Sequence, residues 1–146
     1  MTQGTSGDNT QLLSLLPLIY KTVASASNLR DFGYTKTQLL IFVVLSTHES
    51  LTMSQIAGYI SSSKEQATRA VAPLADDGLV ERYIDPENRT RIHIRLSEKG
   101  SEFVEQYKLR FFRNLQAMLH EKLTEEEMLE LRQAVDTTVR VLSKLN

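Results

Sequence analysis

The 146-residue sequence contains no cysteine, and this absence excludes several kinds of chemistry at once. Disulfide bonds, thiolate metal sites, cysteine nucleophiles and thiol-based redox sensors all require the missing side chain. The three histidines are isolated from one another and lack the spacing of metal ligands. A glycine-rich phosphate-binding loop is also missing, and no nucleophile stands in a recognisable catalytic setting. The sequence therefore predicts neither an enzyme nor a bound metal or cofactor.

Long apolar runs and a strong net charge are lacking as well. No apolar run approaches the ~20 residues that a membrane-spanning helix needs. The first residues, "MTQGTSGDNTQ", do not have the features of a secretory signal. We therefore expect a cytoplasmic protein with no membrane partner. Since the net charge is −1, any binding of nucleic acid must depend on where individual arginines lie.

Four of the six predicted helices begin with the same local signal. The pattern Ser/Thr-x-x-Glu/Gln is a capping box, in which the hydroxyl accepts a hydrogen bond from a backbone N–H of the first turn. The boxes begin at Thr35, Thr52, Ser63 and Thr124. The apolar run "LLIFVVL" by itself also fits a buried strand, but the cap before it and its length favour a helix. The helices are predicted over about 10–30, 36–47, 53–60, 63–77, 97–121 and 125–144.

The apolar pattern changes to strict alternation after Gly78, which we expect to end a helix in the left-handed conformation. Residues 79–84 and 91–96 alternate apolar and polar side chains, and "DPENRT" between them has turn chemistry. These features predict a β-hairpin. We expect Ile92, Ile94 and Leu96 to face inward and Arg91, His93 and Arg95 to face outward.

Two short helices followed by a hairpin have the order of a winged helix-turn-helix unit. The apolar stripe of the second helix is expected to face the core, so its polar side chains lie on the opposite face. Arginine can pair with guanine and glutamine with adenine, and a helix N-terminus suits a phosphate. The residues of this helix predicted to contact DNA are Ser62, Ser63, Lys64, Gln66, Thr68 and Arg69.

The tip of the hairpin is predicted to be a wing that contacts DNA. We expect Arg89 to enter a minor groove, where narrow A·T tracts attract arginine, and Arg91 to hold a phosphate. Asp85 is placed to support the wing by orienting either arginine across the loop. Taken alone, these arginines are ordinary solvated charges on a hairpin. Their position directly after the helix pair favours the DNA interpretation.

The ordered segments "TRAVAPLADDGLVER", "DPENRTR" and "LSEKG" resemble those of MarR-type winged-helix transcription factors, and the resemblance extends over essentially the whole chain. It implies a mainly α (α+β) fold, with residues 1–146 as a single domain. Residues 34–97 would form the winged-helix DNA-binding lobe, and residues 10–30 and 98–146 a helical dimerisation lobe. Such a protein binds double-stranded DNA with a pseudo-palindromic sequence as a homodimer, usually as a repressor, and many are released by a small aromatic or anionic effector.

The sequence departs from the family pattern at three positions. Asn88 stands where the family often has aspartate, so charge contributes less to steadying the wing. Pro73 lies inside the predicted recognition helix, where it removes one backbone hydrogen bond. Glu65 places an anion on the side of that helix that faces DNA.

Two further groups of residues have predicted roles. Tyr20, Phe32 and Tyr34 are candidates for a ligand pocket between the lobes, although single aromatic residues more often belong to a core. The apolar stripe at 128–145 also fits packing within the chain, but two long apolar-faced helices at the chain ends have little core left to cover, which favours packing against a partner. The predicted dimerisation residues are Leu12, Leu16, Phe111, Leu115, Met118, Leu131, Val135 and Leu142.

The main alternative function is a winged-helix interaction module that binds protein and not DNA. Salt-sensitive affinity for a duplex separates the two hypotheses, because only DNA binding releases counterions from phosphates. A third alternative, an enzyme using a cavity between the lobes, has no candidate catalytic residues in the sequence.

Overall fold

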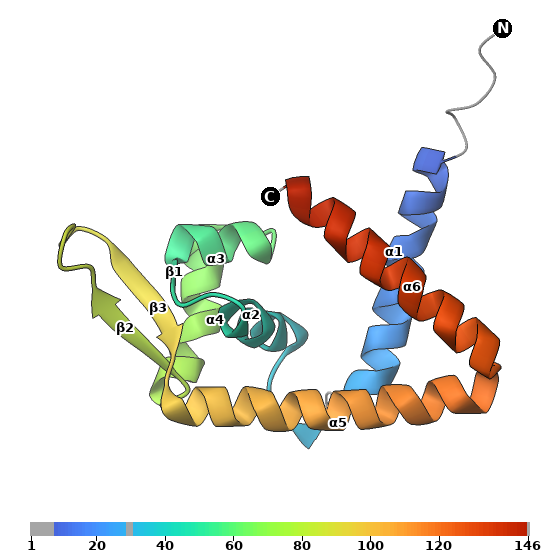
Figure 1. Ribbon diagram of the computed structural model, residues 1–146. Helices are drawn as coiled ribbons and strands as arrows, with labels where there is room; N and C mark the ends of the chain where they lie inside the picture. Colours follow the sequence, from blue (N-terminus) through green and yellow to red (C-terminus); the bar gives the residue numbers. More distant parts are fainter. Residues whose placement is uncertain (1–7, 29–30, 146) are drawn as a thin grey trace, which may run out of the picture. The chain divides into compact units, whose positions relative to one another are not determined.

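The computed structural model describes residues 8–28 and 31–145, with side chains described from residue 11 onward (Figure 1). The fold is mainly helical with one small antiparallel sheet, which confirms the predicted class. Within the described ranges, no helix combines the length and apolar character needed to cross a membrane. The elements are α1 (Asp8–Ser27), α2 (Lys36–Ser46), β1 (Leu51–Thr52), α3 (Met53–Tyr59), α4 (Lys64–Asp76), β2 (Val80–Ile84), β3 (Ile92–Leu96), α5 (Glu98–Lys122), α6 (Glu125–Leu142) and a final 3-10 turn (Ser143–Leu145).

The chain divides into two compact units. One runs from Asn28 to Arg110, and the other combines α1 with the chain from Phe111 onward. The division falls inside α5, whereas the sequence analysis placed the start of the helical lobe at residue 98. The roles of the two units, DNA binding and dimerisation, stay predictions.

All four predicted capping boxes are present. At the start of α2, the Thr35 hydroxyl accepts from the Gln38 N–H at 3.2 Å, and the Gln38 side chain accepts from the Thr35 N–H at 2.9 Å. The same reciprocal pair begins α3 at Thr52, α4 at Ser63 and α6 at Thr124. Each box satisfies backbone N–H groups that have no partner within the helix, so it determines the residue at which the helix begins.

The predicted hairpin belongs to a three-stranded antiparallel sheet with the order β1-β3-β2. Strands β2 and β3 pair from Val80 opposite Leu96 to Ile84 opposite Ile92. Strand β1 adds two residues on the other side of β3, with Leu51 opposite Ile94. The sequence analysis did not predict β1, because two residues are too few to show a period.

The prediction of which β3 side chains face inward is confirmed only in part. Ile94 is fully buried and Leu96 is partly buried, but Ile92 is 53% exposed, so its inward prediction is wrong. Its cross-strand neighbour Ile84 is exposed as well. The reason is that the hairpin extends beyond the helices that cover the sheet (Figure 1), so the strand ends near the tip have nothing to pack against.

The core of the Asn28–Arg110 unit is formed by α2, α3, α4, the sheet and the start of α5. Along α4, Ala67, Val71 and Leu74 are fully buried and Ala70 is partly buried, which confirms the predicted stripe. The helix continues through Pro73 to Asp76, and Gly78 follows it with a φ of +74°, as predicted. The opposite face of α4 is thereby left for solvent or a partner. The largest fully buried side chains of the unit are Phe42, Ile41, Ile56, Leu74, Ile94, Val71 and Val104.

Two of the three predicted ligand-pocket residues pack in an aromatic cluster. The Phe32 ring meets Phe103 edge to face with 5.8 Å between ring centroids, and the Tyr34 ring meets Phe42 and Phe103 at 5.5 and 5.3 Å. Such edge-to-face pairs stabilise a core beyond the area that they bury. The third residue, Tyr20, lies on α1 in the other unit. The ligand pocket therefore stays a prediction.

Tyr34 also ties the segment before α2 to the end of α4, and its titration is a testable consequence. Its hydroxyl donates to Asp77 Oδ2 at 2.8 Å, and burial, together with the hydrogen bond and charge of Asp77, raises the pKa of Tyr34 to about 12. Because the folded pKa exceeds the ordinary value of 10.0, this stabilisation is complete below pH 10 and is lost as the pH rises through 12. We expect ultraviolet titration to show one of the five tyrosines ionising near pH 12. Tyr34→Phe should remove that step; removal of a step near pH 10 instead would contradict the assignment.

Candidate nucleic-acid interface

The first two turns of α4 present the predicted DNA-contacting side chains to solvent. Lys64, Gln66, Thr68 and Arg69 are all exposed, because the buried stripe lies on the opposite face of the helix. Ser62 and Ser63 precede them, partly buried and exposed respectively. All six predicted residues therefore lie in the first turns of α4 or just before it.

Hydrogen bonds within α4 limit how these side chains can be used. The Gln66 side-chain oxygen accepts from the Ser63 N–H at 3.3 Å, so the capping box already uses the acceptor that would read adenine. The Thr68 hydroxyl donates to the Lys64 carbonyl at 2.8 Å and keeps its oxygen as an acceptor. Arg69 is the residue of this face with a planar guanidinium, whose donors are held in a fixed fork that suits a base edge.

A hollow of about 620 Å³ lies between α4 and the hairpin. Lys64 and Thr68 line it from α4, Arg82 from β2 and Arg91 from the residue before β3, and the start of α3 adds polar groups that include Gln55. The sequence analysis missed Arg82. The signal was present, since Arg82 lies opposite the buried Ile94, where the strand pattern called for an apolar side chain.

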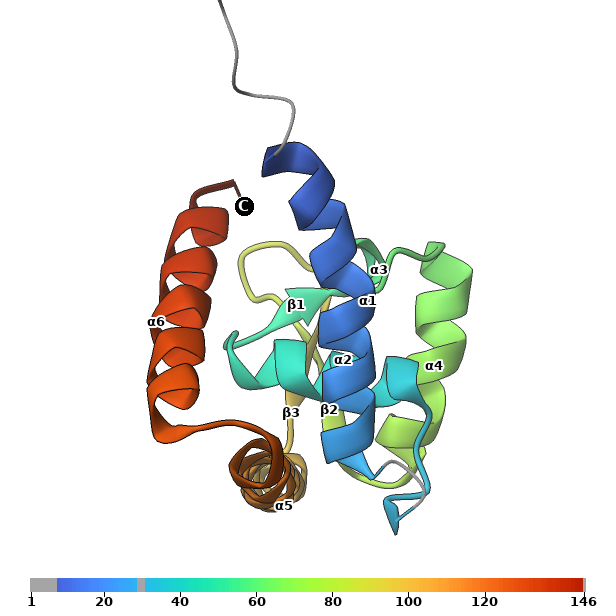
Figure 2. The same ribbon diagram turned by 90° about the vertical axis from the view of Figure 1, so that its right-hand side faces the viewer.

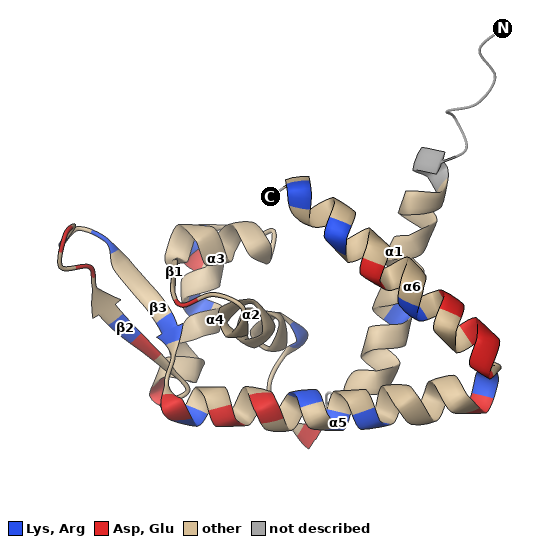
Figure 3. Ribbon diagram, in the orientation of Figure 1, with Lys and Arg blue, Asp and Glu red and all other residues tan. Residues whose placement is uncertain are grey.

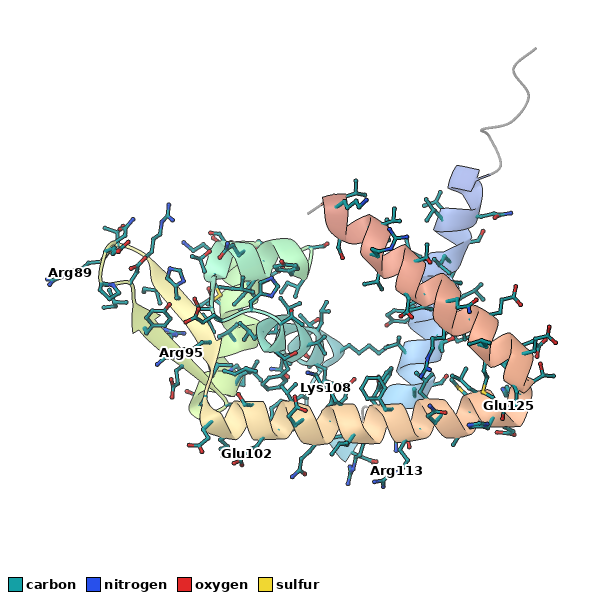
Figure 4. The ribbon with its side chains drawn as sticks, viewed as in Figure 1. Arg89, Arg95, Glu102, Lys108, Arg113 and Glu125 are labelled. Carbon is teal, nitrogen blue, oxygen red and sulfur yellow. The ribbon has the colours of Figure 1, made fainter. Side chains whose placement is uncertain are left out.

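Two side chains shape the tip of the wing through turn hydrogen bonds. Asp85 Oδ1 accepts from the Glu87 N–H at 2.9 Å, and Asn88 Oδ1 accepts from the Thr90 N–H at 3.2 Å and from the Thr90 hydroxyl at 2.5 Å. Arg89 follows Asn88 and extends away from the hairpin (Figure 4). Asn88 therefore steadies the wing by hydrogen bonding, without the charge that the family pattern supplies at this position.

Asp85 has a different partner from the one the sequence suggested. Within the described residues it makes no ion pair with Arg89 or Arg91. Its Oδ2 instead lies 3.9 Å from His93 Nε2. Both arginines keep their guanidinium groups available for an external anion.

The cations around the hollow have no carboxylate partner in the described part of the chain. The ion pairs of this unit that involve lysine or arginine join Arg95 to Glu81 at 3.1 Å and Lys108 to Glu105 at 3.3 Å. Acidic and basic positions alternate along the hairpin (Figure 3), so the surface is not uniformly positive. On α4 and the hairpin, the positive side chains that no ion pair of the described chain matches are Lys64, Arg69, Arg82, Arg89 and Arg91.

Glu65 is the acidic residue of this surface on α4. Hydrogen bonds from its own backbone N–H and from the Ser63 side chain, with Lys64 and Arg69 nearby, hold the pKa of Glu65 below its ordinary value. The carboxylate therefore stays ionised at physiological pH. It lies at the helix N-terminus, where the backbone N–H groups otherwise attract a phosphate.

We expect Glu65→Gln to tighten binding of duplex DNA roughly two- to fivefold at low salt, because it removes a negative charge that opposes phosphate. The gain should shrink as salt is added, since screening weakens the repulsion. Fluorescence anisotropy of a labelled duplex measures both effects. Glu102→Gln, at an exposed position of α5, is the matched control. An affinity at or below that of the control would contradict the role given to Glu65.

The comparisons with known proteins agree with this geometry. Residues 34–92 match the family model described as the MarR family, and this segment includes α4, β2, the wing turn and every residue predicted to contact DNA. Over these residues the chain is similar to the MarR family. The resemblance inferred from the sequence is thereby confirmed.

Sequence relatives support the same assignment over part of the chain. The chain is 31% identical over 78 residues to the transcriptional repressor MprA of Escherichia coli, in strain K12 and in O157:H7. The match covers 52% of this chain and 44% of the relative, so the chain spans less than half the length of these curated proteins.

Solved structures show the MarR-type fold over nearly the whole chain. Wild-type MarR from Escherichia coli in its apo form has a TM-score of 0.76 at 18% identity, covering 95% of this chain and 99% of that protein. A MarR family protein from Bacillus stearothermophilus has a TM-score of 0.76 at 21% identity, with 97% and 99% covered. MepR, a transcription regulator of the Staphylococcus aureus multidrug efflux pump MepA, has a TM-score of 0.67 at 23% identity, with 98% and 100% covered.

Proposed function

We propose that this protein is a sequence-specific DNA-binding transcriptional regulator, a MarR-type repressor that binds a pseudo-palindromic operator as a homodimer. The observation that carries the proposal is the hollow between α4 and the wing, inside the segment that matches the MarR family model. It is lined by cations that have no ion-pair partner among the described residues. The matched family consists of DNA-binding regulators that are not enzymes.

Each part of the surface has a distinct task in this proposal. The start of α4 enters the major groove, where Arg69 pairs with a guanine and Lys64, Ser62 and Ser63 hold the adjacent phosphates. Arg82 and Arg91 line the hollow and hold the phosphate backbone that runs between the two grooves. Phosphate contacts set the register of the protein on the duplex, whereas base contacts set its sequence preference. The exposed Arg89 enters the neighbouring minor groove.

The exposed apolar side chains of α1 and α6 support a second copy of the chain as the partner. Leu12 and Leu16 of α1 are 51% and 66% exposed, and α6 has no buried residue along its length. Apolar surfaces of this extent mark interaction sites in soluble proteins. Of the predicted dimerisation residues, Leu12, Leu16, Leu131, Val135 and Leu142 are exposed and Phe111, Leu115 and Met118 are partly buried.

Two finer features belong to the same proposal. A small aromatic or anionic effector would release the protein from DNA, with Tyr20, Phe32 and Tyr34 as the candidate pocket residues. The protein would act in the cytoplasm, where a regulator of this kind reaches its operator.

The test is selection of binding sites from a random duplex library, followed by measurement of affinity against salt and of molecular mass in solution. We expect a dimer, a palindromic site with half-sites about 10 base pairs apart, and an affinity that falls steeply as salt rises. A strictly monomeric protein that binds no duplex in dilute buffer would overturn the proposal. A stable complex with another protein, without salt-sensitive duplex affinity, would establish the interaction module instead. Repeating the selection with small aromatic acids tests the effector.

A further inference from the structure

His93 lies at the base of the wing, and its two ring nitrogens differ in their hydrogen bonding. Its Nδ1 is 3.2 Å from Ser50 Oγ, which in turn is 3.1 Å from the Tyr83 hydroxyl. Its Nε2 is buried and has no hydrogen-bond partner among the described residues. A buried polar atom without a partner is unusual and destabilising, so this nitrogen has an unmet hydrogen-bonding capacity.

One carboxylate lies near the His93 Nε2 atom, which has no hydrogen-bond partner among the described residues. Asp85 Oδ2 lies 3.9 Å from His93 Nε2, which is too long for a hydrogen bond. The other oxygen of Asp85 accepts from the Glu87 N–H at 2.9 Å, and the Asp85 N–H donates to the Arg91 carbonyl at 3.3 Å. Asp85 is therefore part of the turn that carries Arg89, and its position affects the position of the wing tip.

The strand neighbours of His93 do not supply another unbalanced charge. The Tyr83 ring on β2 lies 5.4 Å from the His93 ring, between centroids, and β1 places the neutral Thr52 opposite His93. The Arg95 guanidinium lies 4.9 Å from the centre of the Tyr83 ring, and it is paired with Glu81. Asp85 is the carboxylate that can respond to a charge on His93.

The cations near His93 lie along the proposed DNA surface. Lys64 from α4 and Arg82 and Arg91 from the hairpin line the same hollow as His93, while the residues of α3 that line it are uncharged. In the proposed complex, bound phosphates offset the positive charge of these side chains.

We infer that His93 is a proton-dependent positioning residue of the wing, an inference that rests on the DNA-binding function proposed above. A neutral imidazole has one N–H, whereas an imidazolium has two and can donate to Ser50 and Asp85 together. The second donation closes the 3.9 Å gap to the roughly 2.8 Å of a charge-assisted hydrogen bond. It orders the turn before DNA arrives, which lowers the entropy lost when Arg89 is placed in the groove. Affinity therefore rises once the pH falls far enough to protonate His93.

The experiment compares the affinity of the full chain for its selected duplex at about pH 6 and about pH 8. We expect wild type to bind roughly fivefold more tightly at the lower pH, and His93→Gln and Asp85→Asn to differ by less than about twofold. Asp85→Asn keeps the oxygen that accepts from Glu87 and removes only the charge. His120→Gln is the matched control, because His120 Nδ1 lies a similar 4.0 Å from Glu125 Oε1 but at an exposed site in the other unit. It should keep the pH dependence of wild type.

A second measurement, by NMR without DNA, separates this inference from the proposed function. The Glu87 amide resonance should titrate together with the His93 ring in wild type and should not do so in Asp85→Asn. If wild type binds duplex but His93→Gln keeps its full pH dependence, the inference is overturned and the function stands. If wild type binds no duplex at either pH, the function fails, and the NMR titration still decides whether His93 controls the wing turn. If the Glu87 amide resonance does not change together with the His93 ring, the inference is overturned.

Discussion

Arg69→Ala is expected to weaken binding of the operator by about ten- to a hundredfold and to relax its base preference at one position of each half-site. Arg69 is exposed on α4, and no carboxylate in the described chain pairs with it. Gln66, the other candidate for reading a base, already uses its side-chain oxygen in the capping box. The loss should therefore fall mainly on recognition of a guanine, because Arg69 is the side chain of this face with donors for bidentate pairing.

The contrast with Arg89→Ala makes this prediction specific. Loss of the wing arginine should weaken binding through the minor groove, leave the bases read by α4 unchanged and reduce the slope of log affinity against log salt by about one. Site selection with each variant distinguishes the two effects, since only Arg69→Ala should return a degenerate base. Arg113→Ala, at an exposed position of α5 in the other unit, is the matched control for the loss of one positive charge. If both variants select the wild-type site with wild-type affinity, the assignment of these residues is wrong.

Gly100→Ala is expected to lower the free energy of unfolding by about 3–5 kcal/mol, a larger effect than most substitutions have. Gly100 is buried in the first turn of α5, against the chain that enters β2. A Cβ there would overlap the Leu79 carbonyl oxygen and lie 2.8 Å from the carbonyl carbon. That oxygen accepts from the Ser97 N–H at 3.0 Å, so the carbonyl cannot move without breaking this bond.

The helix cannot move away either. The Ser97 hydroxyl donates to the Gly78 carbonyl at 2.5 Å and accepts from the Gly100 N–H at 3.0 Å, so both sides of the close contact are tied together. Urea unfolding at one fixed protein concentration measures the effect, since the proposed dimerisation would make apparent stability depend on concentration. Ser101→Ala, at the exposed neighbouring position, should change stability by less than about 0.5 kcal/mol. If the Gly100→Ala protein is as stable as this control, the backbone can shift to accommodate the added Cβ and the prediction is wrong.

Features that depend on a few neighbouring residues could be read from the sequence. The four capping boxes lie where they were predicted, because the hydroxyl, the amide and the backbone groups of each box lie within four consecutive residues. The buried stripe of α4 was equally legible, since the helical period alone decides which side chains share a face. That stripe places Lys64, Thr68 and Arg69 on the outer surface, so the main elements of the site follow from the order of residues along the helix.

The exposure of a strand residue could not be predicted in this way where it depends on how far the helices cover the sheet. Ile92 has the alternation of an inward-facing residue, but the helices that bury Ile94 do not extend to the hairpin tip (Figure 1; Figure 2 gives a second view of the same elements). Arg82 lines the hollow for the same reason. It lies opposite a buried residue, but the helices stop covering the sheet near it, so its side chain is accessible.

The local sequence therefore determined the helix starts, the helix faces and the turn at the wing tip. Pairing between distant residues decided the rest, because a side chain with several possible partners takes the one that the fold brings near. Asp85 lies beside His93, and not beside the arginines closer to the tip, because the register of β2 and β3 sets Tyr83 opposite His93. Strand β1 forms only because β3 offers it backbone partners, with Thr52 set opposite the same histidine.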